Sequence, residues 1–277
     1  MLFLGIDTAT RVGSVGLVRA PLDVGAAIST EPGRIGEGCT SLAEVSRETG
    51  LAHGAELLSL VDECLHAAGA DLEDVAGIAV SSGPGSFTGL RVALATGKGL
   101  AFAGGIPLVG VPTLEALAAT LLPGWALRDP APSPPAADAL IACCLDARKG
   151  ELYAATFAVR EPVWQDADAR LRRLTPDAAQ GPASFCSELR AALDDSPRQC
   201  LLIGDGAERH GDAFAESLGR SVTVLPFTQY PPHGATVARL GAALFAAHGV
   251  QAIGPLVPHY ARASTAEIVR QQRSAKS

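Results

Sequence analysis

A glycine-rich loop between a strand-like run and a helix-like run is the stretch of this sequence best suited to chemistry. The loop spans residues 83–89 and reads GPGSFTG, and the short apolar run Gly77–Val80 before it has the length of a buried strand. Glycines permit positive φ and close approach of the backbone, and Ser86 or Thr88 can cap the helix that follows. A helix N-terminus presents free N–H groups and the positive end of the helix dipole, so Gly83, Gly85 and Ser86 predict a phosphate site. The same geometry also makes an ordinary tight strand-to-helix connection.

Two other short segments carry polar or glycine residues where strands are expected to end. Asp7, Thr8 and Thr10 lie in the turn between the strands expected at 2–6 and 12–18. Their carboxylate and hydroxyls either touch a ligand or hydrogen-bond the backbone of the turn. Further along, the run Gly204, Asp205 and Gly206 repeats the strand-to-helix glycine connection after the strand expected at 200–203, and a helix is expected to follow at 207–218. Local composition predicts loops at 20–38 and 123–137 and a charged, irregular segment at 160–182.

The helix after the first loop carries small residues at every fourth position. One ridge contains Gly89, Ala93, Gly97 and Ala101, and a second contains Ala95, Gly99 and Ala103. An interior glycine costs on the order of 1 kcal/mol relative to alanine, so such ridges need the compensation of a closely packed neighbour. The pattern predicts either a crowded core helix or a helix shared with a second subunit.

The helix expected at 54–68 has an apolar stripe wider than one contact with a sheet requires. This width is consistent with a second buried surface, such as a subunit interface. We therefore expect a partner interface formed by both helices, with these residues: Leu57, Leu58, Val61, Leu65, Arg91, Ala95, Lys98 and Gly99.

Composition bounds the class of protein. Of 277 residues, 48% are hydrophobic and 18% charged, which is typical of a folded globular chain with a substantial core. No apolar run reaches the ~18 residues of a membrane span, and the N-terminus lacks a signal-peptide pattern, so we expect a cytoplasmic protein. A net charge of −7 with no long basic block argues against unaided nucleic-acid binding. The six cysteines show no zinc-like spacing and are expected to be buried thiols.

Six segments in chain order resemble the bacterial TsaB (YeaZ) family, which the central motif identifies most specifically. They are LGIDTATRVGSVGLV (4–18), GPGSFTGLRVALATGKGLA (83–101), GIPLVGVPTLEALA (105–118), LDARKGELYAA (145–155), LLIGDGA (201–207) and PHYAR (258–262). The resemblance implies an α/β chain with the two-lobed actin-like, sugar-kinase-like ATPase fold. We expect a first lobe at 1–105, a second at 106–230, a terminal helix within 231–262 packing back on the first lobe, and a polar tail at 263–277.

The resemblance also implies a location for any nucleotide. In actin-like ATPases the first turn touches the nucleotide phosphates, and two glycine loops face one cleft. Asp7, Thr8 and Thr10 would correspond to that turn, and the loops at Gly83–Gly85 and Gly204–Gly206 to the two phosphate sites. No cofactor is required by this interpretation, and weak binding of ATP or ADP is compatible with it.

Two departures from the related catalytic subunit, TsaD, argue against catalysis by this chain. TsaD follows its glycine-rich helix with a strand and a metal-binding H-x-x-x-H pair, whereas Thr113 and Leu117 stand at those positions here. Leucine cannot coordinate a metal, and a hydroxyl is a weak replacement for imidazole. TsaD also has an aspartate ligand near the start of its last helix, but residues 232–236 contain no carboxylate. We therefore expect no metal site and no catalytic residues.

The expected function is thus that of an accessory subunit in making threonylcarbamoyladenosine at position 37 of tRNA. It would form a heterodimer with a TsaD-like catalytic subunit, or a homodimer in its absence, and would meet a TsaE-like ATPase and tRNA through the complex. Two alternatives are an ATP-dependent small-molecule kinase of the same fold and a metallopeptidase.

Overall fold

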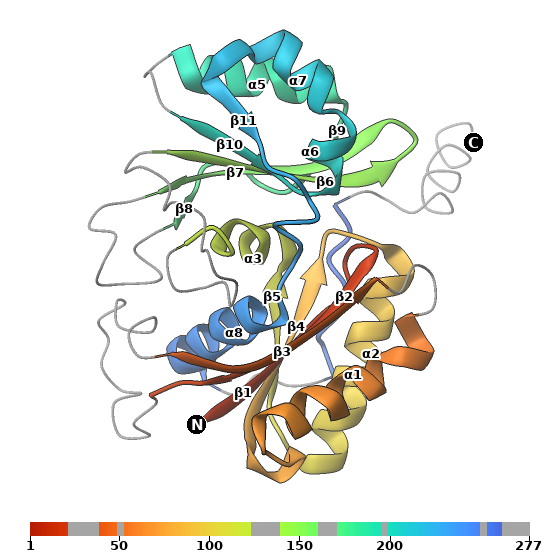
Figure 1. Cartoon of the computed structure of the whole chain (residues 1–277). Coiled ribbons are helices and arrows are strands. Elements are labelled where there is room, and N and C mark those ends of the chain that lie inside the picture. Colours follow the sequence, from red (N-terminus) through yellow and green to blue (C-terminus); the bar gives the residue numbers. More distant parts are fainter. Residues whose placement is uncertain are drawn as a thin grey trace, which may run out of the picture.

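The computed structural model divides the chain into two sheets with helices around them (Figure 1). The structure describes residues 1–21, 39–48, 53–122, 139–159, 171–194, 199–249 and 254–261. The loop expected at 123–137 and the tail expected at 263–277 lie outside these ranges. So do residues 22–38 of the loop expected at 20–38, and residues 160–170 of the irregular segment expected at 160–182.

The first sheet has the strand order β3-β2-β1-β4-β5. Its first three strands form an antiparallel meander, and β4 and β5 then add parallel to β1. The interior strand β4, between β1 and β5, is buried along most of its length, as expected for a parallel strand covered on both faces. The strands are β1 (Leu2–Asp7), β2 (Val12–Arg19), β3 (Thr40–Glu48), β4 (Val75–Gly83) and β5 (Leu108–Pro112).

The second sheet repeats this order as β8-β7-β6-β10-β11. Again the first strands pair antiparallel and the last two add parallel, and a further short strand, β9, pairs with β7 beside β8. The chain therefore contains two copies of one topology, which is the two-lobed actin-like, sugar-kinase-like architecture. The strands are β6 (Leu140–Arg148), β7 (Glu151–Val159), β8 (Leu171–Arg173), β9 (Ala178–Gln180), β10 (Cys200–Ile203) and β11 (Val222–Val224).

Helices cover both faces of each sheet. In Figure 1, α1 and α2 lie on one face of the first sheet and α8 on the other, while α3 lies between the two sheets and α5 to α7 cover the far side of the second. The α-helices are α1 (His53–Ala68), α2 (Phe87–Gly104), α3 (Thr113–Ala119), α5 (Pro182–Asp194), α6 (Asp205–Arg209), α7 (Gly211–Leu218) and α8 (Gly234–His248). Two short 3₁₀ turns, η1 (Leu72–Asp74) and η2 (Gly219–Ser221), precede β4 and β11.

Helix α8 packs on the first sheet with almost no space between the backbones. A Cβ atom at Gly5 would collide with the Gly234 carbonyl, and one at Gly16 would collide with the backbone of Ala235. Apolar side chains fill the space between α8 and the sheet, among them Phe3, Val18 and Ala238. The last long helix of the chain is therefore part of the first lobe.

Three expected boundaries differ in the structure. A lobe boundary at residue 105 is wrong because β5 pairs with β4 in the first sheet. Part of the region expected to be irregular forms β8 and β9, which are too short to show a periodic pattern. The single helix expected at 207–218 is instead two helices, α6 and α7, with a break at His210. Among the described residues, no helix is both long and apolar enough to cross a bilayer.

Candidate functional site

The first glycine loop is packed against the chain itself. Gly83 has φ of +120°, and its N–H donates to the Thr113 hydroxyl oxygen at 3.0 Å. The Ser86 N–H donates to the Ala9 carbonyl at 2.7 Å, and a Cβ at Gly85 would lie 2.7 Å from the same oxygen. Of the two caps that the sequence predicts, Ser86 and Thr88, it is Ser86 that caps α2, and its hydroxyl accepts from the Gly89 N–H at 3.2 Å. Close approach of the chain's own backbone therefore accounts for the glycines.

The polar side chains of the β1–β2 turn are also engaged within the chain. Asp7 is fully buried and accepts from the Ala9 N–H at 3.0 Å and from the Ser81 hydroxyl. Burial raises the pKa of this carboxyl, although both hydrogen bonds oppose the shift. Thr8 donates to the Gly89 carbonyl at 2.7 Å, and the Thr10 hydroxyl closes the turn by accepting from the Val12 N–H at 3.2 Å. Each of these three side chains thus forms a hydrogen bond within the chain, as expected if its role is to hold the turn.

The second glycine loop is built in the same way against β6. Gly204 has φ of +116°, and a side chain there would collide with the Cys144 carbonyl. The Asp205 carboxylate accepts from the Asp146 N–H at 3.0 Å, and burial raises its pKa. A Cβ at Gly206 would lie 3.0 Å from the Asp146 nitrogen. Both loops therefore follow the end of a strand, and close contacts within the chain explain why glycine stands at these positions.

The short helix α3 connects the two loops. Thr113 at its start holds the Gly83 N–H, and Leu117, one turn later, packs near Gly204. Leu117 is 1% exposed and belongs to the core of the second lobe. Thr113 and Leu117, the positions where the resemblance to TsaD leads us to look for metal ligands, thus each contact one of the two glycine loops.

Arg11 crosses from the β1–β2 turn to the second lobe. Its guanidinium pairs with Glu48 at 3.0 Å and with Glu208 of α6 at 3.7 Å. It also lies 4.4 Å from the centre of the Phe227 ring, a cation–π contact. This side chain therefore ties the tip of the first hairpin to the second lobe.

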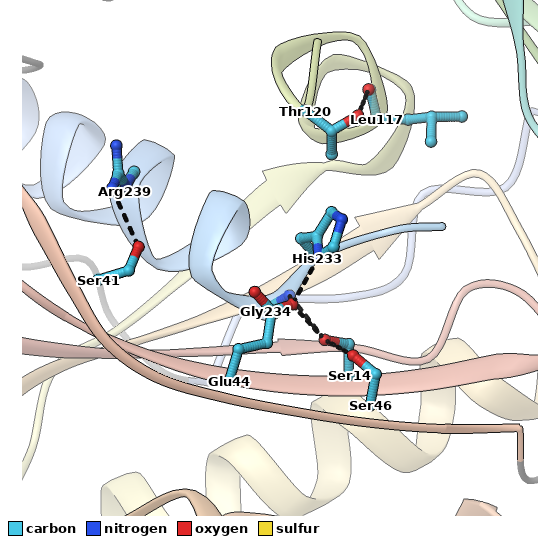
Figure 2. A network of polar contacts seen from close by, with 9 residues as sticks. All are labelled: Ser14, Ser41, Glu44, Ser46, Leu117, Thr120, His233, Gly234 and Arg239. Atoms are coloured by element: carbon cyan, nitrogen blue, oxygen red, sulfur yellow. Dashed lines mark hydrogen bonds and ion pairs between the residues drawn. The ribbon is translucent and has the colours of Figure 1, made fainter. Parts of the chain in front are cut away.

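A buried carboxylate stands at the start of α8, although residues 232–236 contain none. Glu44 of β3 accepts on one oxygen from the Ser14 hydroxyl at 2.8 Å and from the Gly234 N–H at 3.1 Å, and the His233 ring nitrogen lies 2.8 Å away (Figure 2). A negative charge is stabilised at a helix N-terminus by the exposed N–H groups and the dipole. The sequence pattern did not single out Glu44. The signal that could have found it is its position on β3, where it alternates with the apolar residues Ala43 and Val45 and so faces the other side of the sheet.

The residues predicted for an interface on α1 and α2 fall into three groups according to their burial and their contacts. Leu57, Val61 and Leu65 are at most 9% exposed and form part of the core of their own lobe, so their prediction as interface residues is wrong. The wide stripe of α1 is explained by packing on both the sheet and α2. Leu58 is 57% exposed.

On α2, the two small-residue ridges have different surroundings. Gly97 packs inward against Val80 and Leu108, whereas a Cβ at Gly99 would meet nothing within 4 Å. Ala95 and Gly99 are exposed. Phe102, one turn further along, is 87% exposed. Arg91 and Lys98, expected at a partner edge, contact residues 254–260 of the same chain.

Comparison with known proteins gives matches over nearly the whole chain. The chain is 27% identical over 269 residues to "tRNA threonylcarbamoyladenosine biosynthesis protein TsaB" of Bacillus subtilis, covering 96% of both proteins. It superposes on the structure "YeaZ from Pseudomonas aeruginosa" with a TM-score of 0.66 and 25% identity, over 94% of this chain and 99% of that one. The chain matches the TsaB (YeaZ) family over nearly its whole length.

The TsaB family and the TsaD family share one part of this fold. The family model "TsaD: tRNA N6-adenosine threonylcarbamoyltransferase" matches residues 45–175 of the chain. The "tRNA N6-adenosine threonylcarbamoyltransferase" of Agrobacterium fabrum is 49% identical over 69 residues, which are 25% of this chain and 19% of that protein. The region that the TsaD model matches includes α1, α2 and α3. These helices carry the exposed residues of α1 and α2 and the two positions Thr113 and Leu117.

Metal sites in proteins are commonly built from clusters of three or more His, Cys, Asp or Glu side chains. No such cluster occurs within the residues whose positions are described. Five of the six cysteines are buried, and burial raises the pKa of Cys64 and Cys200 to about 12, which keeps these thiols protonated.

Proposed function

We propose that this chain is a non-catalytic accessory subunit in the formation of threonylcarbamoyladenosine at position 37 of tRNA. Its relative from Bacillus subtilis is named for biosynthesis of that nucleoside. The TsaD model that matches residues 45–175 is named for the transferase itself. Relatedness to both families supports a role beside a TsaD-like catalytic subunit.

One observation carries the non-catalytic part of the proposal. The Thr113 hydroxyl accepts the Gly83 N–H, and Leu117 is buried in the core of the second lobe. Neither side chain can act as the imidazole ligand that the catalytic relative has at the equivalent position. Glu44 supplies a carboxylate at the start of α8, but Gly234, Ser14 and His233 already engage its Oε1 atom.

The outer face of α1 and α2 is the surface proposed for the partner. Leu58, Ala95, Gly99 and Phe102 are exposed on it. A TsaD-like chain carries the corresponding helices, and two copies of one helix pair can pack around an approximate two-fold axis. The small residues of α2 would let the partner's helix approach closely. The same face would serve a homodimer when the catalytic subunit is missing, and a TsaE-like ATPase and tRNA would bind to the complex.

Nucleotide binding is a separate prediction for the cleft. The glycines of both loops are accounted for by contacts inside the chain, so binding of ATP or ADP is expected to be weak. Titration calorimetry of the isolated chain with MgATP measures this directly. Tight binding accompanied by phosphoryl transfer would favour the kinase alternative instead.

Reconstitution tests the proposed function. The full chain, the TsaD-like subunit and the TsaE-like ATPase are combined with unmodified tRNA and activated substrate, and threonylcarbamoyladenosine is measured by mass spectrometry of the digested tRNA. We expect modification only when this chain and the catalytic subunit are both present. Modification at the full rate without this chain, or turnover of a substrate by this chain alone, would contradict the proposal.

A bulky substitution tests the proposed face. Ala95→Trp places a large ring on the exposed ridge of α2 and is expected to abolish the heterodimer on a sizing column while the monomer stays folded. Ala191→Trp is the matched control, because Ala191 is exposed on α5 of the other lobe. Full retention of the complex by Ala95→Trp would exclude this face.

A further inference from the structure

A segment near the C-terminus lies along the outer side of α2. The Lys98 ammonium donates to the Gly254 carbonyl at 3.1 Å, and the Arg91 Nε donates to the Tyr260 hydroxyl at 2.9 Å. These contacts join parts of the chain 156 and 169 residues apart in sequence. Residues 254–260 are therefore an added layer on the helix that carries the proposed interface.

Arg91 is held in a cluster with two aromatic rings. Its guanidinium carbon lies 3.7 Å from the centre of the Phe87 ring and 5.9 Å from that of Tyr260. The two ring centres are 5.3 Å apart. Among the described residues, Arg91 forms its hydrogen bond through Nε, so its two terminal nitrogens can serve acceptors on another molecule.

A second attachment fixes the position of Tyr260 independently of Arg91. The His259 N–H donates to the Ser82 carbonyl at 2.6 Å, and a side chain at Gly83 would collide with the His259 carbonyl. The His259 ring also lies 3.8 Å from the Asp177 carboxylate of the second lobe. The first glycine loop thus sets where the Tyr260 ring lies over α2.

Exposed apolar side chains gather on this side of the molecule. Seven large hydrophobic side chains are exposed among the described residues, and five of them belong to α1, α2 or residues 254–260. These five are Leu58, Phe87, Phe102, Val257 and Tyr260. Aromatic residues and arginine are enriched in the energetically important parts of protein interfaces.

We propose that residues 254–260 form one edge of the partner-docking surface, with Arg91, held by Phe87 and Tyr260, as its anchor. This rests on the proposed function and adds a second element to that interface. The occupant is a chain with the same helix pair, because the TsaD model matches this chain over α1 and α2. Because Phe87 and Tyr260 pre-order Arg91, less side-chain entropy is lost when the partner binds.

Affinity measurements with full-length chains test this proposal. Dissociation constants for the TsaD-like subunit are measured by calorimetry for Arg91→Ala, Tyr260→Ala and Tyr260→Phe. We expect Arg91→Ala and Tyr260→Ala to weaken binding about tenfold or more, as for anchor residues of interfaces. Tyr260→Phe keeps the ring and should stay within about threefold of wild type. Leu174→Ala is the control, since Leu174 is exposed on the second lobe, and it should leave affinity unchanged.

The outcomes separate this proposal from the proposed function. Wild-type affinity for both Arg91→Ala and Tyr260→Ala, with loss of the complex in Ala95→Trp, would overturn the role of residues 254–260 alone. Wild-type affinity in all three variants would overturn the α1–α2 face as well. Circular dichroism and thermal unfolding of each variant verify that the monomer is folded, and Arg91→Ala gives an independent result if Tyr260→Ala unfolds.

Discussion

The hydroxyl oxygen of Thr113 accepts a hydrogen bond from the backbone N–H of Gly83 at 3.0 Å. Both residues are buried, so this N–H has no access to water. The bond fixes the end of β4 to the start of α3. The Thr113 hydroxyl, which stands where the resemblance to TsaD would place a metal ligand, thereby has a structural role in this chain.

Removing this acceptor should destabilise the fold. Thr113→Val keeps the shape of the side chain but leaves the Gly83 N–H buried without a partner, which costs about 1–3 kcal/mol. We expect the free energy of unfolding, measured by urea titration, to fall by that amount. Thr113→Ser keeps the hydroxyl and should recover most of the loss. Equal stability of the valine variant and wild type would contradict a structural role for this bond.

Replacing the carboxylate at the start of α8 should also destabilise the protein. Glu44→Gln keeps the size of the side chain but removes the negative charge that the helix N-terminus and three polar groups stabilise. We expect a loss of about 1–2 kcal/mol in the free energy of unfolding.

Glu48→Gln is the matched control on the same strand. The Glu48 side chain is 69% exposed, and surface ion pairs contribute at most about 1 kcal/mol. This change should therefore cost less than Glu44→Gln. Equal effects of the two substitutions would show that the helix N-terminus gains nothing from Glu44.

Asp7 should give the protein a measurable pH dependence of stability. Burial raises its pKa in the folded state above the ordinary value of 3.8. A carboxyl with a raised folded pKa contributes its stability below the unfolded pKa and loses it as pH rises through the folded pKa. The stability of wild type relative to Asp7→Asn should therefore fall as pH increases from about 3.8 and then level off.

Urea titrations of wild type and Asp7→Asn at a series of pH values measure this difference. The side chain at position 7 of the asparagine variant cannot ionise, so carboxyls that do not interact with Asp7 affect both proteins equally and cancel in the comparison. A difference that stays constant with pH, or that grows in favour of wild type as pH rises, would contradict the raised pKa.

Local sequence patterns predicted the elements of the fold better than they predicted the surfaces. Glycine loops after apolar runs indicated the strand–loop–helix units, and a cap at Ser86 or Thr88 was predicted, because these features depend on neighbours within a few residues. Glu44 and Tyr260 could not be placed in this way, since their contacts cross 190 and 169 residues of sequence. The burial of Leu57 was missed for a related reason: an apolar stripe does not reveal how many faces are covered by the same chain.

The two glycines of α2 provide a matched pair for the small-residue ridges. A Cβ at Gly97 would lie 2.7 Å from the Val80 Cγ1 atom, whereas one at Gly99 would meet nothing within 4 Å. Within a helix, alanine is favoured over glycine by about 1 kcal/mol. Gly99→Ala should therefore stabilise the monomer by up to about 1 kcal/mol, while Gly97→Ala should destabilise it because overpacking costs about 1–3 kcal/mol.

The same pair distinguishes packing within the chain from packing against a partner. If the partner's helix lies against Gly99, the stabilised Gly99→Ala monomer should bind the TsaD-like subunit more weakly than wild type, because the added methyl group separates the backbones. Thermal unfolding of the monomer and calorimetry of the complex should then change in opposite directions. Unchanged affinity in Gly99→Ala would mean that this ridge does not approach the partner closely, whatever the stability of the monomer.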